Sequence, residues 1–357
     1  MTSVQTRPRG LPGRAYTDPA VLQRELDVVF PTAWQLVGHV GQIPNDGDYL
    51  TATVGDQGVV VLRSAGRVRA MFNVCQHRGH ELLVTATGHV NRITCPYHAW
   101  TYDREGRLLR ARGADVGQLC VPAVRVESLA GYLFVTLDPD APDLDEYAPG
   151  VAAELTALAP NADRRVLSHT NTVIVEANWK LAVENYNECY HCPNVHTTFT
   201  TGVVAKGSYR IASTGYCTRH TAEATANPAY ERHADGNAYG SFFLWPASAI
   251  QCYPGRVLNT FRWVPLAVDR TLLIRQWWFD APFPTPAEQE IIDLDWDTTV
   301  AEDLLLLASV QRGMRSRGYR PGPLVLDPSG VADTGTENPV LHLQRLFRAA
   351  VPEGEYW

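Results

Sequence analysis

The chain has 357 residues, of which 45% are hydrophobic and 19% are charged, so it is long enough for roughly two or three domains with a substantial core. Its net charge of −7 argues against a nucleic-acid partner, and no apolar run reaches the length of a membrane span. The N-terminus lacks the apolar core of a signal peptide and the cysteine count is odd, so we expect a cytoplasmic protein.

Short elements fill the first part of the chain. A helix capped by Asp18, with Pro19 at its first position, is predicted to run to about Phe30. Alternating strands follow, and the clearest are Trp34–Val40, Tyr49–Val54, Gly58–Arg63, Val68–Asn73 and Tyr132–Leu137. The polar, proline-broken segment 138–146 is a natural domain boundary. We therefore expect an N-terminal helix over 1–33, an all-β domain over 34–145 and a second domain over 146–357.

Two short pairs of metal-ligating side chains lie in the first domain, Cys75 with His77 and Cys95 with His98. Each pair supplies one thiolate and one imidazole, which together are the ligand set of a Rieske [2Fe–2S] cluster. A structural Cys2His2 zinc site needs the same ligand types, but it usually opens with two cysteines separated by two to four residues. Here the first pair has a single residue between its ligands, and strand and turn residues follow the second pair. The sequence therefore predicts an electron-transferring cluster, with zinc as the alternative.

A second metal site is predicted in the second half of the chain. Residues 178–196 are expected to form a helix interrupted near Pro193, and His191 and His196 straddle that break. Two histidines alone are more often surface or core residues, but the Rieske ligands elsewhere in the chain favour iron. Non-haem Fe(II) that activates O2 needs two imidazoles and one carboxylate on one face of the metal. The candidates for the carboxylate lie far downstream, at Asp295, Asp297, Glu302 and Asp303.

The second domain is predicted to be α+β with an antiparallel sheet. Strands at Ser241–Tyr253, Arg256–Pro265 and Thr271–Phe279 alternate with helices near 178–191 and 286–315. These strands are expected to wall a substrate pocket, and only half of a strand's aromatic rings can face it because side chains alternate. The rings, each of which could instead fill the core, are Phe242, Phe243, Trp245, Tyr253, Phe261, Trp263, Trp277 and Trp278. Cys189 and Cys192 have Cys-X-X-Cys spacing, but without a thioredoxin-like context we interpret them as packing residues.

These motifs resemble those of the Rieske-type non-haem iron oxygenases. Cys-Gln-His-Arg-Gly at 75–79 and Cys-Pro-Tyr-His-Ala-Trp at 95–100 are similar to the Rieske domain of that family, and the segment from Asn178 to His196 resembles its iron-site helix. The resemblance implies an all-β Rieske domain followed by a helix-grip catalytic domain. It also implies a cluster held by Cys75, His77, Cys95 and His98, and a mononuclear iron held by His191, His196 and Asp303. Asp303 is preferred because it precedes a Val-Gln-X-Gly segment that is similar to the family's.

Glu188 matches the acidic position that in this family links the Rieske histidine of a neighbouring subunit to the iron-site histidine. The family more often has Asp there, and Glu occurs in the branch that oxidises quaternary ammonium compounds such as glycine betaine, stachydrine and carnitine. Without the resemblance, Glu188 would be interpreted as a helix-surface carboxylate.

The resemblance implies a homotrimeric terminal oxygenase that hydroxylates or N-demethylates a small amine or quaternary ammonium compound with O2. No Gly-X-Gly-X-X-Gly follows a predicted strand, so a separate NAD(P)H-dependent reductase with flavin and iron–sulfur centres is expected to supply the electrons. The alternatives are hydroxylation or dihydroxylation of an aromatic ring, and a non-catalytic electron-transfer protein.

Overall fold

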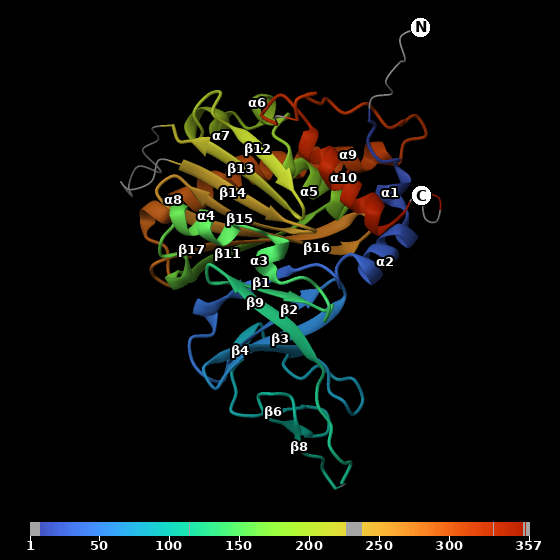
Figure 1. Ribbon diagram of the computed structural model, residues 1–357, viewed down its shortest axis with the longest axis vertical. Coiled ribbons are helices and arrows are strands. Elements are labelled where there is room, and N and C mark those ends of the chain that lie inside the picture. The colour runs from blue at the N-terminus through green and yellow to red at the C-terminus, as the bar shows by residue number, and fades with distance from the viewer. Residues whose placement is uncertain (1–7, 114, 226–237, 331, 353, 355–357) are drawn as a thin grey trace.

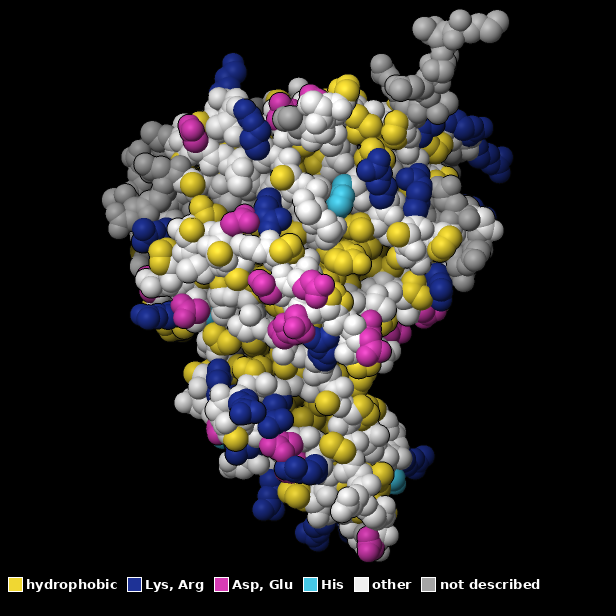
Figure 2. Space-filling view, viewed as in Figure 1, with side chains coloured by type: hydrophobic (Ala, Val, Ile, Leu, Met, Phe, Trp, Pro, Cys, Tyr) yellow, Lys and Arg dark blue, Asp and Glu magenta, His cyan; other side chains and the backbone are white. Residues whose placement is uncertain are grey.

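The structure is a computed structural model that describes residues 8–113, 115–225, 238–330, 332–352 and 354. A narrow β-rich lower part, blue to green in Figure 1, projects from a wider upper part. The same narrow projection is visible in the space-filling view (Figure 2). Residues 1–7 of the expected N-terminal segment and 355–357 of the expected second domain lie outside the described residues.

The lower part is built from two antiparallel sheets. The larger has seven strands in the order β1-β10-β9-β4-β3-β2-β5, and the smaller has the order β6-β7-β8. The strands are β1 (Gln35–His39), β2 (Asp48–Val54), β3 (Gln57–Ser64), β4 (Arg67–Phe72), β5 (Thr87–His89), β6 (Ile93–Thr94), β7 (Thr101–Tyr102), β8 (Leu108–Arg110), β9 (Ala123–Leu129) and β10 (Tyr132–Thr136). The strands predicted from alternation are therefore confirmed. The small sheet lies at the tip of the lower part (Figure 1).

The upper part contains one seven-stranded antiparallel sheet in the order β11-β17-β16-β15-β14-β13-β12. Its strands are β11 (Val166–Val175), β12 (Arg210–Thr214), β13 (Cys217–Glu223), β14 (Ala238–Leu244), β15 (Ser248–Tyr253), β16 (Val257–Ala267) and β17 (Arg270–Phe279). Its helices are α3 (Leu144–Tyr147), α4 (Val151–Leu158), α5 (Trp179–Asn187), α6 (Cys192–Val195), α7 (Thr197–Gly202), α8 (Pro286–Asp295), α9 (Ala301–Met314) and α10 (Asn338–Ala350). Helix α5 contacts both β16 and α9, so it lies between the sheet and the C-terminal helices. This arrangement confirms the predicted α+β class.

Two predicted elements differ from the structure. The single strand expected over 241–253 is a hairpin, because Pro246 lies in the turn between β14 and β15 and lacks the N–H that a central strand would need. The helix expected to reach residue 191 ends at Asn187, and Glu188 has an extended backbone. The Glu188 carboxylate accepts hydrogen bonds from the backbone N–H groups of Tyr190 and His191, which holds the chain in a turn. Pro193 lies inside α6 and does not cause the break.

The N-terminal helices are α1 (Arg14–Thr17) and α2 (Pro19–Val28), and α1 contacts α9 of the upper part. Glu25 is buried, forms an ion pair with Lys180 at 2.5 Å and accepts a hydrogen bond from the Trp179 indole at 2.8 Å. The Tyr16 hydroxyl donates to Glu184. These contacts fix α5, the helix that leads into the metal site described below. Within the described ranges, no helix has both the length and the apolar character that a membrane span requires.

Candidate metal centre

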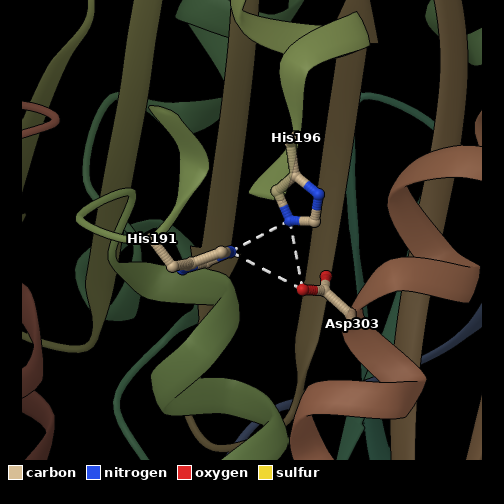
Figure 3. A group of neighbouring side chains, drawn as sticks. All are labelled: His191, His196 and Asp303. Atoms are coloured by element: carbon tan, nitrogen blue, oxygen red, sulfur yellow. Dashed lines mark hydrogen bonds and ion pairs between the residues drawn. The ribbon is translucent and has the colours of Figure 1, made fainter. Parts of the chain in front are cut away.

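Three side chains from separate segments converge on one point (Figure 3). His191 lies in the turn after α5, His196 lies between α6 and α7, and Asp303 lies in the first turn of α9. The Nε2 atoms of the two histidines are 2.9 Å apart, and they lie 3.5 Å and 3.1 Å from Asp303 Oδ1. The structure therefore brings together the three residues that the resemblance implies.

Each imidazole is held from behind by a carboxylate. His191 Nδ1 lies 2.5 Å from Glu188 Oε1, and His196 Nδ1 lies 2.8 Å from Glu302 Oε2. A neutral histidine that donates its Nδ1 proton to a carboxylate presents the lone pair of Nε2 to the metal. Burial alone would lower the pKa of His196, but the carboxylates of Asp303 and Glu302 raise it above its ordinary value. The negative charge of these carboxylates around His196 therefore favours the binding of a cation between the donors.

The spacing of these donors fits an iron ion. Ligand bonds of about 2.1 Å at right angles place adjacent donor atoms about 3 Å apart, close to the observed separations. Within the described part of the chain, Asp303 Oδ1 is buried and has no hydrogen-bond partner. Two imidazoles and one carboxylate on one face are the donor set of non-haem Fe(II) oxygenases.

The alternative carboxylates differ in their contacts. Asp295 forms a buried ion pair with Arg275 and accepts a hydrogen bond from Tyr253 at 2.8 Å. Glu302 contacts the far nitrogen of His196. Among the described residues, the group of converging donors contains Asp303 and not Asp297. Asp303 also lies inside a continuous helical run, because α8 passes through the π-helical turn Trp296–Val300 directly into α9. The charge of Asp303 therefore does not serve to cap a free helix end.

A cavity that is partly open to solvent lies beside the three donors. Of the eight aromatic rings on the expected pocket strands, Tyr253, Phe261 and Trp263 line it. Four further rings that the sequence did not single out also line it: Tyr186, Phe199, Tyr209 and Tyr239. The other five rings on these strands lie outside the cavity lining and pack in the core: Phe242, Phe243, Trp245, Trp277 and Trp278. Alternation along the strands turns Phe242 and Trp278 to the other face of the sheet, whereas Phe243 and Trp277 lie on the same face as the cavity but outside its lining.

Cys189 and Cys192 are not two independent packing residues, and this prediction was wrong. They form a disulfide with Cα atoms 4.9 Å apart, because the turn after α5 and the start of α6 bring them together around His191. Both are buried and both line the cavity. The five remaining cysteines are free, including Cys75 and Cys95.

The predicted cluster residues lie in two similar loops at the tip of the lower part. In each loop, the N–H four residues after the cysteine donates to the cysteine carbonyl: Gly79 to Cys75, and Ala99 to Cys95, both at 3.0 Å. Gly79 and Ala99 both have positive φ, 72° and 59°, which turns each loop back on itself. The two loops therefore present their cysteines and histidines in equivalent positions.

The four side chains are arranged so that the thiols are buried and the imidazoles reach the surface. Cys75 and Cys95 are 3% and 2% exposed, whereas His77 is exposed and His98 is half-buried. The rings of His77 and His98 are 4.7 Å apart between centroids, and Trp100 stacks on His77. The Tyr102 hydroxyl lies 3.3 Å from Cys75 Sγ. Such a set could hold a two-iron cluster, with the cysteine side in the protein and the histidine side facing solvent.

Comparison with known protein families agrees with both sites. Residues 33–123 match the Rieske [2Fe-2S] domain, and residues 155–353 match the ring hydroxylating alpha subunit catalytic domain. The carnitine monooxygenase oxygenase subunit of Escherichia coli is 32% identical to the chain, covering 94% of the chain and 92% of that protein. The chain belongs to the Rieske non-haem iron oxygenases. Members of this family use a [2Fe-2S] cluster and a mononuclear iron, so this oxygenase is an enzyme with both cofactors.

Other relatives place the oxygenase in the quaternary-ammonium branch. The glycine betaine monooxygenase oxygenase subunit of Chromohalobacter salexigens is 30% identical, covering 88% of the chain and 81% of that protein. A solved quaternary ammonium Rieske monooxygenase, described for carnitine oxidation by gut microbiota, superposes with a TM-score of 0.87 at 28% identity over 96% of both chains. A naphthalene 1,2-dioxygenase with indole bound has a TM-score of 0.80 at 19% identity over 96% of this chain and 92% of its own, and shares the fold.

Sequence reasoning missed the role of Glu302, and the available signal was ambiguous. Glu302 precedes Asp303 in the chain, so it was weighed as a competing ligand. On a helix, neighbouring residues point about 100° apart, which sends Asp303 to the shared point and Glu302 to the outer nitrogen of His196. An acidic pair beside a predicted ligand can therefore indicate a ligand together with its supporting carboxylate.

Proposed function

We propose that this oxygenase is the terminal component of a multicomponent monooxygenase that oxidises a carbon next to nitrogen in a small quaternary ammonium compound. The observation that carries the proposal is the opening of the His191, His196 and Asp303 donor group into a cavity rich in aromatic rings. Aromatic faces attract a quaternary ammonium group through cation–π interaction, worth about 2 kcal/mol once water is excluded.

The geometry supports a role for each of these residues. Cys75, His77, Cys95 and His98 are proposed to hold the [2Fe–2S] cluster, and His191, His196 and Asp303 are proposed to hold the mononuclear iron. When bound, that iron supplies open coordination positions at which O2 is activated. Glu188 and Glu302 hold the Nδ1 protons of the two histidines and so keep both Nε2 atoms directed at the metal.

Electron transfer is proposed to run between subunits. Within one chain, the cluster loops lie at the tip of the lower part and the His/Asp group lies beside α6 and α9 at the opposite end (Figure 1). An imidazole edge of the cluster is exposed, and Glu188 lies half-buried beside His191. A homotrimer in which each Rieske tip docks beside the Glu188 of the next subunit would join the two sites by a short path. A separate NAD(P)H-dependent reductase is proposed to deliver the electrons to the cluster.

The proposed reaction balances as a monooxygenation. One atom of O2 enters a C–H bond next to the nitrogen, the other leaves as water, and NAD(P)H supplies two electrons through the reductase with one further proton from solvent. The hydroxylated carbon then releases the amine and an aldehyde. If a methyl group is attacked, the aldehyde is formaldehyde.

A single-turnover experiment tests this proposal without the reductase. The protein loaded with both metal centres is reduced with dithionite, freed of reductant, and mixed with O2 and one of carnitine, 4-(trimethylammonio)butanoate, glycine betaine or choline. We expect an aldehyde and the corresponding amine from at least one of the four. His191→Ala should retain the cluster signal in electron paramagnetic resonance and form no product. His89→Ala, a change at an exposed histidine bonded to Asp48, should behave as wild type.

Two outcomes would contradict the proposal. Oxidation of naphthalene or indole with no amine product would assign the cavity to aromatic rings. Product formation by His191→Ala at the wild-type yield would mean that the His/Asp group is not the site of oxygen chemistry.

A further inference from the structure

The disulfide between Cys189 and Cys192 encloses a proposed iron ligand. The bond closes the short segment 189–192, in which His191 stands next to Cys192, and the Cys192 N–H donates to the Cys189 carbonyl at 3.2 Å. The segment passes directly into α6, where the His196 N–H donates to the Cys192 carbonyl at 2.9 Å. Both proposed histidine ligands therefore lie on one stretch of chain that the disulfide closes at its start.

The disulfide and the Glu188 carboxylate hold the same turn by different means. Glu188 accepts hydrogen bonds from the N–H groups of Tyr190 and His191 and also contacts His191 Nδ1. A covalent cross-link removes open conformations of the loop that it closes, so less conformational entropy is lost when a ligand binds there. Opening the bond should free the turn to adopt conformations in which His191 Nε2 points away from His196.

The two sulfur atoms also belong to the surroundings of the metal donors. Cys189 and Cys192 line the same cavity as His191, His196 and Asp303. Thiolates are soft ligands for iron, zinc and copper, so two free thiols in this cavity can compete with the carboxylate for a metal. In a disulfide, neither sulfur is an anionic ligand. The oxidised form therefore leaves the metal to the two imidazoles and the carboxylate.

Small reagents can reach this bond through the cavity. Cys189 and Cys192 are 1% and 5% exposed, but the cavity that they line is partly open to solvent. A disulfide is opened by thiols through exchange, in which a thiolate attacks one of its two sulfurs. The sequence predicts a cytoplasmic protein, and the few disulfides of that compartment are mostly catalytic or redox-sensing. This pair therefore suits reversible chemistry better than a permanent cross-link.

We propose that Cys189 and Cys192 form a reversible redox switch of the mononuclear iron site. The disulfide form holds the two histidines ready for Fe(II), and the dithiol form binds Fe(II) more weakly. In the switching step the Sγ–Sγ bond breaks, each sulfur gains one electron and one proton, and the two thiols of a small dithiol reductant form a disulfide. A small disulfide oxidant reverses the step. This inference rests on the proposed iron site but not on the proposed substrate.

Fe(II) binding by the two redox forms tests the switch. The protein keeps its Rieske cluster, confirmed by visible absorbance, and is stripped of mononuclear iron. One sample is incubated with dithiothreitol and another with the cyclic disulfide of dithiothreitol, and both are then freed of reagent under anaerobic conditions. Alkylation of the unfolded protein with iodoacetamide should label seven cysteines after reduction and five after oxidation. Titration against a competing chelator should show about tenfold weaker Fe(II) binding by the reduced form.

A double substitution assigns the response to this pair. Cys189→Ala/Cys192→Ala cannot form the bond, so treatment with dithiothreitol should change its Fe(II) affinity by less than about twofold. Cys120→Ser is the matched control, because Cys120 is an exposed free cysteine that does not line the cavity. It should keep the wild-type difference between the two redox forms.

The outcomes separate the switch from the iron site. Equal Fe(II) affinity of the two wild-type forms would overturn the switch and leave the proposed iron site in place. Labelling of only five cysteines after reduction would show a permanent cross-link and would also overturn the switch. Failure of both forms to bind Fe(II) would overturn the switch together with the iron site. A redox response that persists in the double variant would assign the response to other groups, whereas the wild-type comparison decides the question even if that variant does not fold.

Discussion

Removal of the carboxylate behind His196 should weaken iron binding while leaving all three proposed iron ligands in place. Glu302 Oε2 lies 2.8 Å from His196 Nδ1, and the Glu302 side chain is 33% exposed, whereas His196 is 3% exposed. In Glu302→Ala the imidazole loses the acceptor that fixes its ring orientation and its tautomer. Replacing such supporting groups typically lowers metal affinity by about 10–100-fold, which equals about 1.4–2.8 kcal/mol.

Anaerobic titration measures this change directly. Protein stripped of mononuclear iron is titrated with Fe(II) against a competing chelator, while the visible absorbance of the cluster confirms that the Rieske site is intact. Glu302→Gln retains an acceptor oxygen without the charge, so it should fall between wild type and Glu302→Ala. Asp297→Ala is the matched control, because Asp297 is an exposed acid five residues earlier that lies outside the donor group.

Two results would refute the reasoning. An iron affinity of Glu302→Ala within about twofold of wild type would mean that the hydrogen bond to Nδ1 contributes nothing to binding. An equal loss in Asp297→Ala would mean that general negative charge, and not the contact with His196, attracts the metal.

Three further predictions concern the scaffold and the cluster. Glu25→Ala leaves the buried Lys180 ammonium without its ion-pair partner and should lower the free energy of unfolding, measured with urea, by about 3–5 kcal/mol. Adding Lys180→Met removes the unpaired charge and should recover part of the loss. A double variant less stable than Glu25→Ala would contradict this account. Burial raises the pKa of Glu184 from 4.5 to about 7, so the folded state retains a proton that the unfolded state releases. The free energy of unfolding of wild type should therefore fall, relative to that of Glu184→Gln, as the pH rises from about 5 to about 7.5. A constant difference between the two proteins across that range would refute this prediction. Tyr102→Phe removes the hydroxyl beside Cys75 Sγ and should lower the reduction potential of the cluster, measured by voltammetry, because a hydrogen bond to the sulfur stabilises the reduced form. An unchanged potential would mean that this contact does not influence the reduction potential.

Both proposed metal sites could be predicted from the sequence where their candidate ligands are close together in the chain. Cys75 and His77 are separated by one residue, and His191 and His196 by four, so each pair has a spacing that local backbone turns can direct to one metal. The strands of the first domain were predictable for a similar reason, since alternation of apolar residues is a local property of the chain. The class of chemistry followed from the ligand types alone. Thiolates with imidazoles suit an iron–sulfur cluster, whereas imidazoles with a carboxylate suit a mononuclear iron.

The tertiary structure decided which distant residues join those pairs. Four acidic residues within nine positions were plausible iron ligands. The packing of α9 against α5 brings Asp303 to the two histidines, whereas Asp295 forms an ion pair with Arg275. The rings that line the cavity depended on strand register and on the hairpin at Pro246, which the local pattern does not specify.

A row of polar side chains across the upper sheet is the clearest case. Its members, His220, Ser241, Gln251 and Asn259, are spread over four strands and 40 residues, and antiparallel pairing makes them neighbours. When the chain is read in order, the local pattern of each strand does not indicate that its polar residue belongs to such a row. Local spacing therefore predicted the candidate metal ligands, whereas sheet register, a non-local property, determined which polar residues become neighbours across the sheet.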